Sequence, residues 1–167
     1  MGIDWSVEGD RCTALLRDLI RIPTVNRGTG EPDDGNERPA AERIAEELRA
    51  AGLEPTFFEK EPNRTNLVVR IRGTGEKPPL LLNAHLDVVD ADPATWTHPP
   101  FGAEIHDGCI WGRGAVDMKN MAAMCTRVMV MLAARTRPLA RDVIFAAVAD
   151  EEAGCERGSL FLVESHP

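Results

Sequence analysis

The chain has 167 residues, of which 43% are hydrophobic and 28% are charged. These values are typical of one compact globular domain and exclude a largely disordered chain. The formal net charge is −8. This acidity disfavours nucleic acid and anionic membrane as partners, because both require basic surface patches. We therefore expect no nucleic acid and no membrane partner.

The cysteine pattern and the N-terminal sequence indicate the cellular compartment of the protein. The four cysteines lie far apart and include no C-x-x-C pair, which favours free thiols in a reducing compartment over a disulfide framework. The first ten residues carry three acidic residues and lack the basic and apolar regions of a secretory signal. No apolar run approaches the ~20 residues of a membrane span. The sequence thus predicts a cytoplasmic protein.

Four segments have the apolar spacing of helices. The first spans residues 12–20, and the second runs from about 36 to 52 with Pro39 in its first turn. The third spans about 119–135, and a fourth begins near Arg157. The third helix is expected to bury a stripe made of Met121, Met124, Cys125, Val128, Met131 and Leu132.

Three short apolar runs predict strands at residues 66–71, 80–84 and 143–149. The last two are apolar throughout rather than alternating, which indicates strands that helices cover on both faces. Strands that alternate with helices are typical of an α/β fold. We expect a mixed, largely parallel sheet flanked by helices. No internal repeat or inter-domain linker is evident.

Metal-capable side chains follow two of the predicted strands and precede the third predicted helix. They are His85 and Asp87 after one strand, Asp117 before the helix, and Asp150, Glu151 and Glu152 after the other strand. In open α/β sheets, sites form beyond the carboxyl ends of the strands. We therefore expect these six side chains to meet at one edge of the sheet.

Such a concentration of acids is costly without a cation. Two carboxylates about 4 Å apart repel each other by a few kcal/mol at an effective dielectric constant near 20. Nitrogen and carboxylate ligands suit zinc, and they are compatible with cobalt or manganese. Singly, each group also fits a surface histidine, a helix cap or a solvated loop. Their joint placement favours a metal site.

Three ordered stretches resemble the N-terminal signatures of M20 metallopeptidases. They are His-Leu-Asp-Val-Val at 85–89, Trp-Gly-Arg-Gly-Ala-Val-Asp-Met-Lys at 111–119 and Ala-Asp-Glu-Glu-Ala-Gly at 149–154. This family includes succinyl-diaminopimelate desuccinylases, acetylornithine deacetylases, glutamate carboxypeptidases and aminoacylases. The resemblance covers nearly the whole chain from about residue 10. It implies that residues 1–167 are the N-terminal portion of an M20-type catalytic domain, without the lid or dimerisation domain and without the C-terminal part of the catalytic domain.

The resemblance also implies a role for each acidic residue. The metal ligands would be His85, Asp117 and Glu152. Asp117 would bridge two zinc ions and, as is frequent in the family, would precede a cis peptide bond. Asp87 would fix the ring of His85, and Glu151 would be the general base that takes a proton from water. Asp150 would be a supporting acid.

The implied activity is metal-dependent hydrolysis of an amide or peptide bond next to a carboxylate. The substrate would be a small peptide or an N-acyl amino acid, and the choice between peptidase and deacylase stays open. A homo-oligomer is compatible with the family. The three remaining histidines match no ligand position and are expected at the surface; they are His98, His106 and His166.

Two alternatives remain. The isolated chain is short of the further ligands that the family places later in its sequence, so it would be a non-catalytic fragment or metal-binding domain, inactive by itself. The second alternative is an aminopeptidase of a related dizinc family, but the sequence of residues 111–119 resembles the M20 signature more closely.

Overall fold

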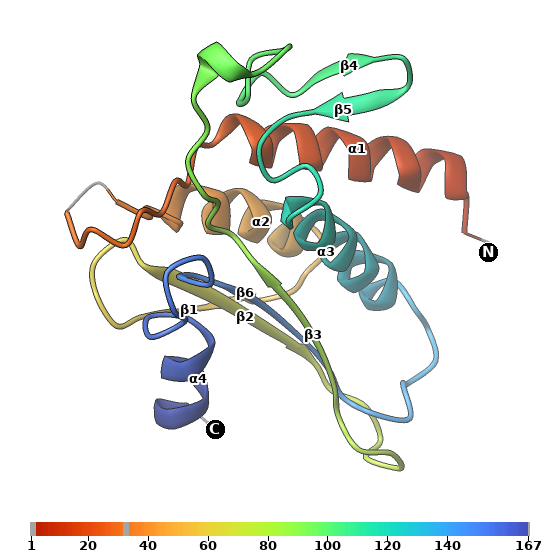
Figure 1. The fold of residues 1–167 in the computed structure, drawn as a ribbon. Coiled ribbons are helices and arrows are strands. Elements are labelled where there is room, and N and C mark those ends of the chain that lie inside the picture. The colour runs from red at the N-terminus through yellow and green to blue at the C-terminus, as the bar shows by residue number, and fades with distance from the viewer. Residues whose placement is uncertain (1–2, 32–33, 167) are drawn as a thin grey trace.

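The computed structural model describes residues 3–31 and 34–166 (Figure 1). Pro32 and Asp33, which precede the second predicted helix in the sequence, lie outside the described residues. The helices are α1 (Trp5–Arg21), α2 (Arg38–Ala50), α3 (Lys119–Ala133) and α4 (Ser159–Ser165), with a short 3-10 helix η1 (Pro93–Thr95). The strands are β1 (Thr56–Glu59), β2 (Thr65–Ile71), β3 (Leu80–His85), β4 (Glu104–His106), β5 (Cys109–Trp111) and β6 (Val143–Val148).

Local sequence signals explain where the first two helices begin and end. The Asp4 carboxylate caps α1 by accepting hydrogen bonds from the backbone amides of Ser6 and Val7. Pro39 lies in the first turn of α2, as predicted, where its missing N–H costs nothing. Gly52 follows that helix with a φ of 77°, the left-handed conformation that ends helices. None of the described helices has the length and apolar character that a membrane crossing requires.

The main sheet has the strand order β1-β2-β6-β3. A mixed sheet flanked by helices is confirmed, but the expectation that it is largely parallel is wrong. Among its described strands, β3 and β6 pair in parallel, whereas β2 pairs antiparallel with both β1 and β6. Residues 72–79 reverse the chain between β2 and β3. The crossover through α3 then returns β6 parallel to β3 and beside β2, so β6 must run antiparallel to β2.

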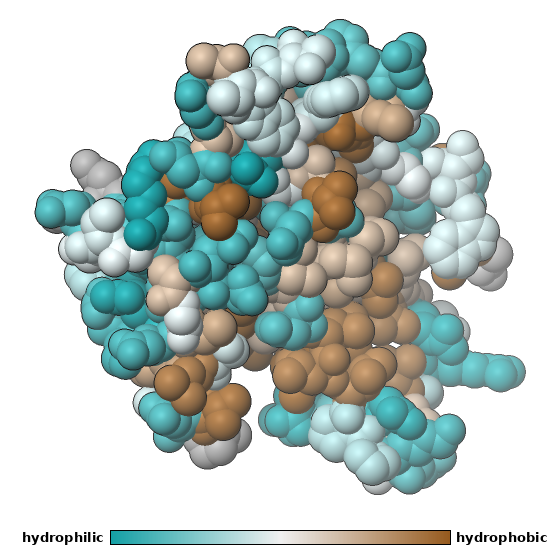
Figure 2. Space-filling model, in the orientation of Figure 1, coloured by the Kyte–Doolittle hydropathy of each residue, from teal (hydrophilic) through white to brown (hydrophobic). Residues whose placement is uncertain are grey.

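One face of this sheet carries the core, and the other face is largely open. Helices α2 and α3 pack on the covered face, with α1 behind them (Figure 1), and Phe145 of β6 is fully buried there. On the opposite face Leu81 is 59% exposed. Helix α4 flanks a groove of about 470 Å³ on this face, and Figure 2 shows apolar side chains gathered beside it. The prediction that helices cover β3 on both faces is therefore wrong for the described residues.

The predicted buried stripe of α3 is confirmed at Cys125 and wrong at Met121, Met124 and Val128. The helix buries Ala122, Cys125 and Met129, whereas Met121 and Met124 are 39% and 42% exposed. Helix α3 is apolar on most of its sides, so its spacing does not single out one buried face. The helix packs against α1 and β3, and its small residues Ala122 and Ala123 are fully buried.

Candidate metal centre

The parallel strands β3 and β6 end at the same edge of the sheet. His85 is the last residue of β3 and lies opposite Val148, the last residue of β6. The Nε2 atom of His85 lies 3.0 Å from the Oδ1 atom of Asp117 and 3.7 Å from the Oε2 atom of Glu151. One ligand atom each of His85, Asp117 and Glu152 lies within 4.8 Å of the other two. The structure thus brings the three predicted metal ligands together.

The segment that carries Asp117 is held close to α1 by glycine. A Cβ atom on Gly112 would lie 2.5 Å from the Cγ2 atom of Ile20, so only glycine fits there. Gly114 adopts a φ of 83°, and its carbonyl accepts a hydrogen bond from the backbone amide of Lys119. The Asp117–Met118 peptide bond is cis, as the resemblance implied.

Asp87 lies behind the candidate metal ligands and is fully buried. Its Oδ1 atom accepts from the backbone amide of Glu151 at 3.1 Å, and its Oδ2 atom accepts from that of Glu152 at 3.0 Å. The Nδ1 atom of His85 lies 2.9 Å from the backbone carbonyl of Asp87 and 3.4 Å from its carboxylate. The side chain of Asp87 therefore holds the acidic loop, which is formed by Asp150, Glu151 and Glu152. Its backbone carbonyl makes the shorter contact with the imidazole of His85.

The charges of this cluster shift its acid–base equilibria. Burial opposes a charge on His85, but hydrogen bonds to Asp87 and Asp117 outweigh burial and raise the pKa of His85 to about 9. Burial, together with the neighbouring Asp87, Asp117 and Glu151, raises the pKa of Glu152. Burial also acts to raise the pKa of Asp87, but the hydrogen bonds that it accepts lower it overall. The site concentrates negative charge around one imidazole.

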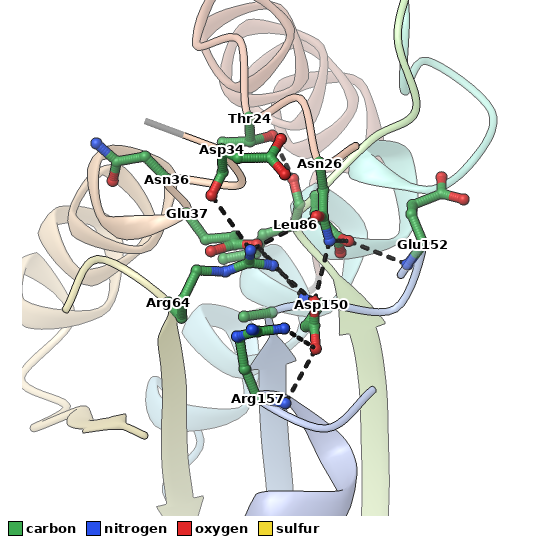
Figure 3. Close-up of polar contacts among 12 residues, drawn as sticks. Thr24, Asn26, Asp34, Asn36, Glu37, Arg64, Leu86, Asp150, Glu152 and Arg157 are labelled. Carbon is green, nitrogen blue, oxygen red and sulfur yellow. Dashed lines mark hydrogen bonds and ion pairs between the residues drawn. The ribbon is translucent and has the colours of Figure 1, made fainter. Parts of the chain in front are cut away.

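A buried polar network supports the acidic loop from behind (Figure 3). Asp150 is fully buried and has a φ of 64°, a conformation uncommon outside glycine. Its Oδ1 atom accepts from Arg64 at 2.9 Å and from Asn26 at 3.2 Å, and its Oδ2 atom accepts from the backbone amide of Arg157 at 3.0 Å. Asn26 also donates to Asp87 at 2.8 Å. These contacts hold the loop in the conformation that points Glu151 and Glu152 at the site.

Glu37 completes this network from the start of α2. Its side chain is fully buried, and its Oε1 atom lies 2.9 Å from the Nη2 atom of Arg64. Burial raises the pKa of Glu37 to about 8, since it outweighs the nearby guanidinium. Sequence reasoning missed Asn26, Glu37 and Arg64 as parts of the site. They come from three separate segments, and nothing in their local sequence distinguishes them from ordinary loop and cap residues.

The donor set at the strand ends fits a divalent transition metal. It offers one imidazole nitrogen and carboxylate oxygens, which is the ligand chemistry of zinc and of related ions. The His85 side chain is 4% exposed, whereas those of Asp117 and Glu151 are 77% and 51% exposed. A buried imidazole with exposed acids around it leaves the site open to an ion and to a substrate from solvent.

Comparisons with known proteins identify the family. The model of peptidase family M20/M25/M40 matches residues 81–166, about half of the chain. A succinyl-diaminopimelate desuccinylase from Methylobacterium radiotolerans is 34% identical over an alignment of 160 residues that covers 93% of this chain and 38% of that protein. The chain therefore belongs to the M20/M25/M40 peptidase family, and it spans a little over a third of the length of this curated relative.

Solved structures support the fold. Human carnosine dipeptidase 1 has a TM-score of 0.74 at 18% identity, with 95% of this chain and 36% of that chain covered. A dinuclear metal binding peptidase of the M20 family from Bacillus subtilis has a TM-score of 0.64 at 18% identity, with 97% and 40% covered. At such identities the similarity establishes the fold of the chain. The resemblance drawn from the sequence motifs is thus confirmed.

Proposed function

We propose that this chain carries the metal-binding part of a hydrolase that cleaves an amide or peptide bond next to a carboxylate. The observation that carries the proposal is the convergence of His85, Asp117 and Glu152 within 4.8 Å at the strand ends. Relatives named as a desuccinylase and a dipeptidase support a small peptide or N-acyl amino acid as the substrate. A cytoplasmic location, a homo-oligomer and the lack of nucleic acid or membrane partners stay predictions.

Each residue of the site has a role in this proposal. His85 presents Nε2 as a ligand because its Nδ1 atom is engaged by the carbonyl of Asp87. Asp117, 3.0 Å from that nitrogen, would be shared between two zinc ions, and Glu152 would bind the second ion. When bound, such ions acidify water and polarise a carbonyl group. The relative titled as a dinuclear metal binding peptidase supports two ions, and cobalt or manganese suits the same donors.

Glu151 is the proposed general base. Its carboxylate reaches the edge of the ligand cluster, 3.7 Å from His85 Nε2, and its backbone amide is fixed by Asp87. From this position it would accept a proton from the attacking water and pass it to the leaving amine. Because the backbone amide of Glu151 is anchored and its carboxylate is 51% exposed, the carboxylate is free to move between the water that donates the proton and the amine that accepts it.

A Glu151→Gln variant tests this role. With zinc-loaded protein and N-acyl amino acids or dipeptides as substrates, we expect kcat to fall by ~10²-fold or more while zinc content stays the same. Glu156→Gln is the matched control, because Glu156 is exposed in the same loop and lies outside the ligand cluster. Equal kcat values for the unchanged protein and Glu151→Gln would remove Glu151 from this role.

The second candidate is a metal-binding domain without activity of its own. Two observations favour it: the chain spans 38% of its curated relative, and one face of its sheet exposes apolar residues such as Leu81. Calorimetric titration of zinc into the 167-residue chain separates the candidates. Two tight sites together with hydrolysis support the enzyme, whereas zinc binding without hydrolysis supports the domain.

A further inference from the structure

A second group of metal-capable side chains lies on the β4–β5 hairpin. Among the described residues, His98, Glu104 and His106 form a cluster in which one ligand atom of each lies within 4.8 Å of the others. The Nε2 atom of His106 lies 2.8 Å from Glu104 Oε2, and the Nδ1 atom of His98 lies 3.6 Å from the same oxygen. One carboxylate oxygen therefore faces two imidazole nitrogens.

The backbone and the ring packing hold these three groups in place. Glu104 and His106 are alternate residues of β4, so their side chains project from the same face of the strand. The rings of His98 and His106 are stacked, with centroids 3.7 Å apart and planes 10° from parallel. The Trp111 ring packs edge-on against His98 at 4.7 Å. The two imidazoles are thus positioned beside the carboxylate before any ion binds.

We propose that His98, Glu104 and His106 form a peripheral binding site for a divalent transition metal ion, zinc foremost. Two nitrogens and one carboxylate oxygen match zinc, whereas calcium and magnesium prefer oxygen ligands alone. Ligands about 2.1 Å from a zinc ion lie about 3.4 Å from one another in a tetrahedron. Small side-chain rotations therefore suffice to convert the present contacts into coordination, with water as the fourth ligand.

This site is separate from the centre at the strand ends, and it does not rest on the proposed function. The two sites share no residue. Figure 1 shows the hairpin on the side of α1 that faces away from the four-stranded sheet, and Arg17 of α1 donates to the carbonyl of Ala103 just before β4. The side chains of His98, Glu104 and His106 are 22%, 44% and 43% exposed, so an ion can reach them from solvent.

The site has a structural consequence for the segment around it. His98 lies in the loop before Pro99, and the other two ligands lie on β4, so a bound ion would tie the loop to the hairpin. The hairpin leads directly into residues 111–117, which carry Asp117. An ion here would therefore stabilise the segment that delivers one ligand of the strand-end centre.

Metal counting tests the proposal. The metal-free chain is dialysed against zinc, and the bound zinc is measured by atomic absorption. We expect His98→Gln and His106→Gln to bind one zinc ion fewer per chain than the unchanged protein. His166→Gln is the control, because His166 is exposed and lies outside both clusters; it is expected to bind the full number.

Further variants keep this test independent of folding and of the strand-end centre. Glu104→Gln preserves side-chain shape and removes the anionic ligand, so it should weaken zinc binding at this site, with circular dichroism as the check of folding. His85→Gln should lose zinc at the strand-end centre and retain it here. Copper(II) bound here should quench Trp111, and this quenching should be lost in His106→Gln. Unchanged zinc content in folded His98→Gln and His106→Gln would overturn the proposal.

Discussion

Glu37 offers a sharp test of the electrostatics behind the metal centre. The single guanidinium of Arg64 lies 2.9 Å from both the Glu37 and the Asp150 carboxylates, which are fully buried. Asp150 also accepts from Asn26 and from the backbone amide of Arg157, whereas the Oε2 atom of Glu37 has no hydrogen-bond partner among the described residues. Asp150 has a second cation, because the Nη1 atom of Arg157 lies 3.6 Å from its Oδ2 atom, whereas among the described residues Glu37 pairs only with the shared guanidinium of Arg64. We therefore expect Glu37 to hold the proton, consistent with its pKa near 8.

The sign and size of the effect follow from linkage. Unfolded Glu37 titrates near its usual pKa of 4.5, and burial raises the folded pKa to about 8. Between these values the folded state retains a proton that the unfolded state releases, so the free energy of unfolding falls as pH rises. At about 1.4 kcal/mol per pKa unit, the difference corresponds to roughly 5 kcal/mol across the window. This contribution is present in full below the unfolded pKa and is lost as pH rises through the folded pKa.

Urea unfolding of Glu37→Gln measures this contribution. Glutamine resembles the protonated acid and does not titrate, so the variant should lose less stability than the unchanged protein between about pH 5 and about pH 8. Over this pH range the free energy of unfolding of the variant should therefore rise by several kcal/mol relative to that of the unchanged protein. Glu54→Gln, at an exposed position, should follow the unchanged protein at every pH. If Glu37→Gln also runs parallel to it, Glu37 is ionised throughout and the reasoning fails.

Two further predictions concern the framework of the site. Lys119 is fully buried and donates from Nζ to the carbonyls of Leu19 and Ile22. Lys119→Met removes both hydrogen bonds, although the Leu19 carbonyl keeps the one from the backbone amide of Ile22, and should lower the free energy of unfolding by ~1–3 kcal/mol in urea; an unchanged value would contradict this assignment. A Cβ atom on Gly158 would collide with the backbone carbonyl of Ala149, so Gly158→Ala should displace the loop after β6 and weaken zinc binding at the strand-end centre by about tenfold or more in calorimetry. Native zinc affinity in that variant would show that the loop adapts without cost.

The sequence by itself predicted the elements that local patterns define. Apolar spacing located α1, and Pro39 marked the start of α2. The short strand β1 and the β4–β5 hairpin were not predicted, because four or three residues with little apolar alternation carry no clear period. A helix or strand can be predicted from its own sequence when a residue such as Pro39 constrains the backbone, or when only one face of the element is apolar.

The cluster of candidate metal ligands was also predictable, whereas the residues that support it were not. His85, Asp117 and Glu152 are residue types with a distinctive ligand chemistry, and each lies at the end of a strand, shortly after one or shortly before a helix. Asn26, Glu37 and Arg64 have common side chains whose role arises only when three distant segments meet around Asp150. The cost of burying these groups depends on their neighbours in space, which sequence spacing does not reveal.

Only the tertiary structure decided the direction of β6, the buried face of α3 and the open face of the sheet. Each depends on contacts between segments far apart in the chain. An apolar run such as β3 fits burial on one face or on both, and a helix with several apolar sides packs wherever small residues allow the closest approach. Local pattern thus indicated the longer helices and strands and the candidate ligand residues, because these follow from backbone geometry and ligand type. Long-range packing then set the strand direction and the burial that raises the pKa of Glu37.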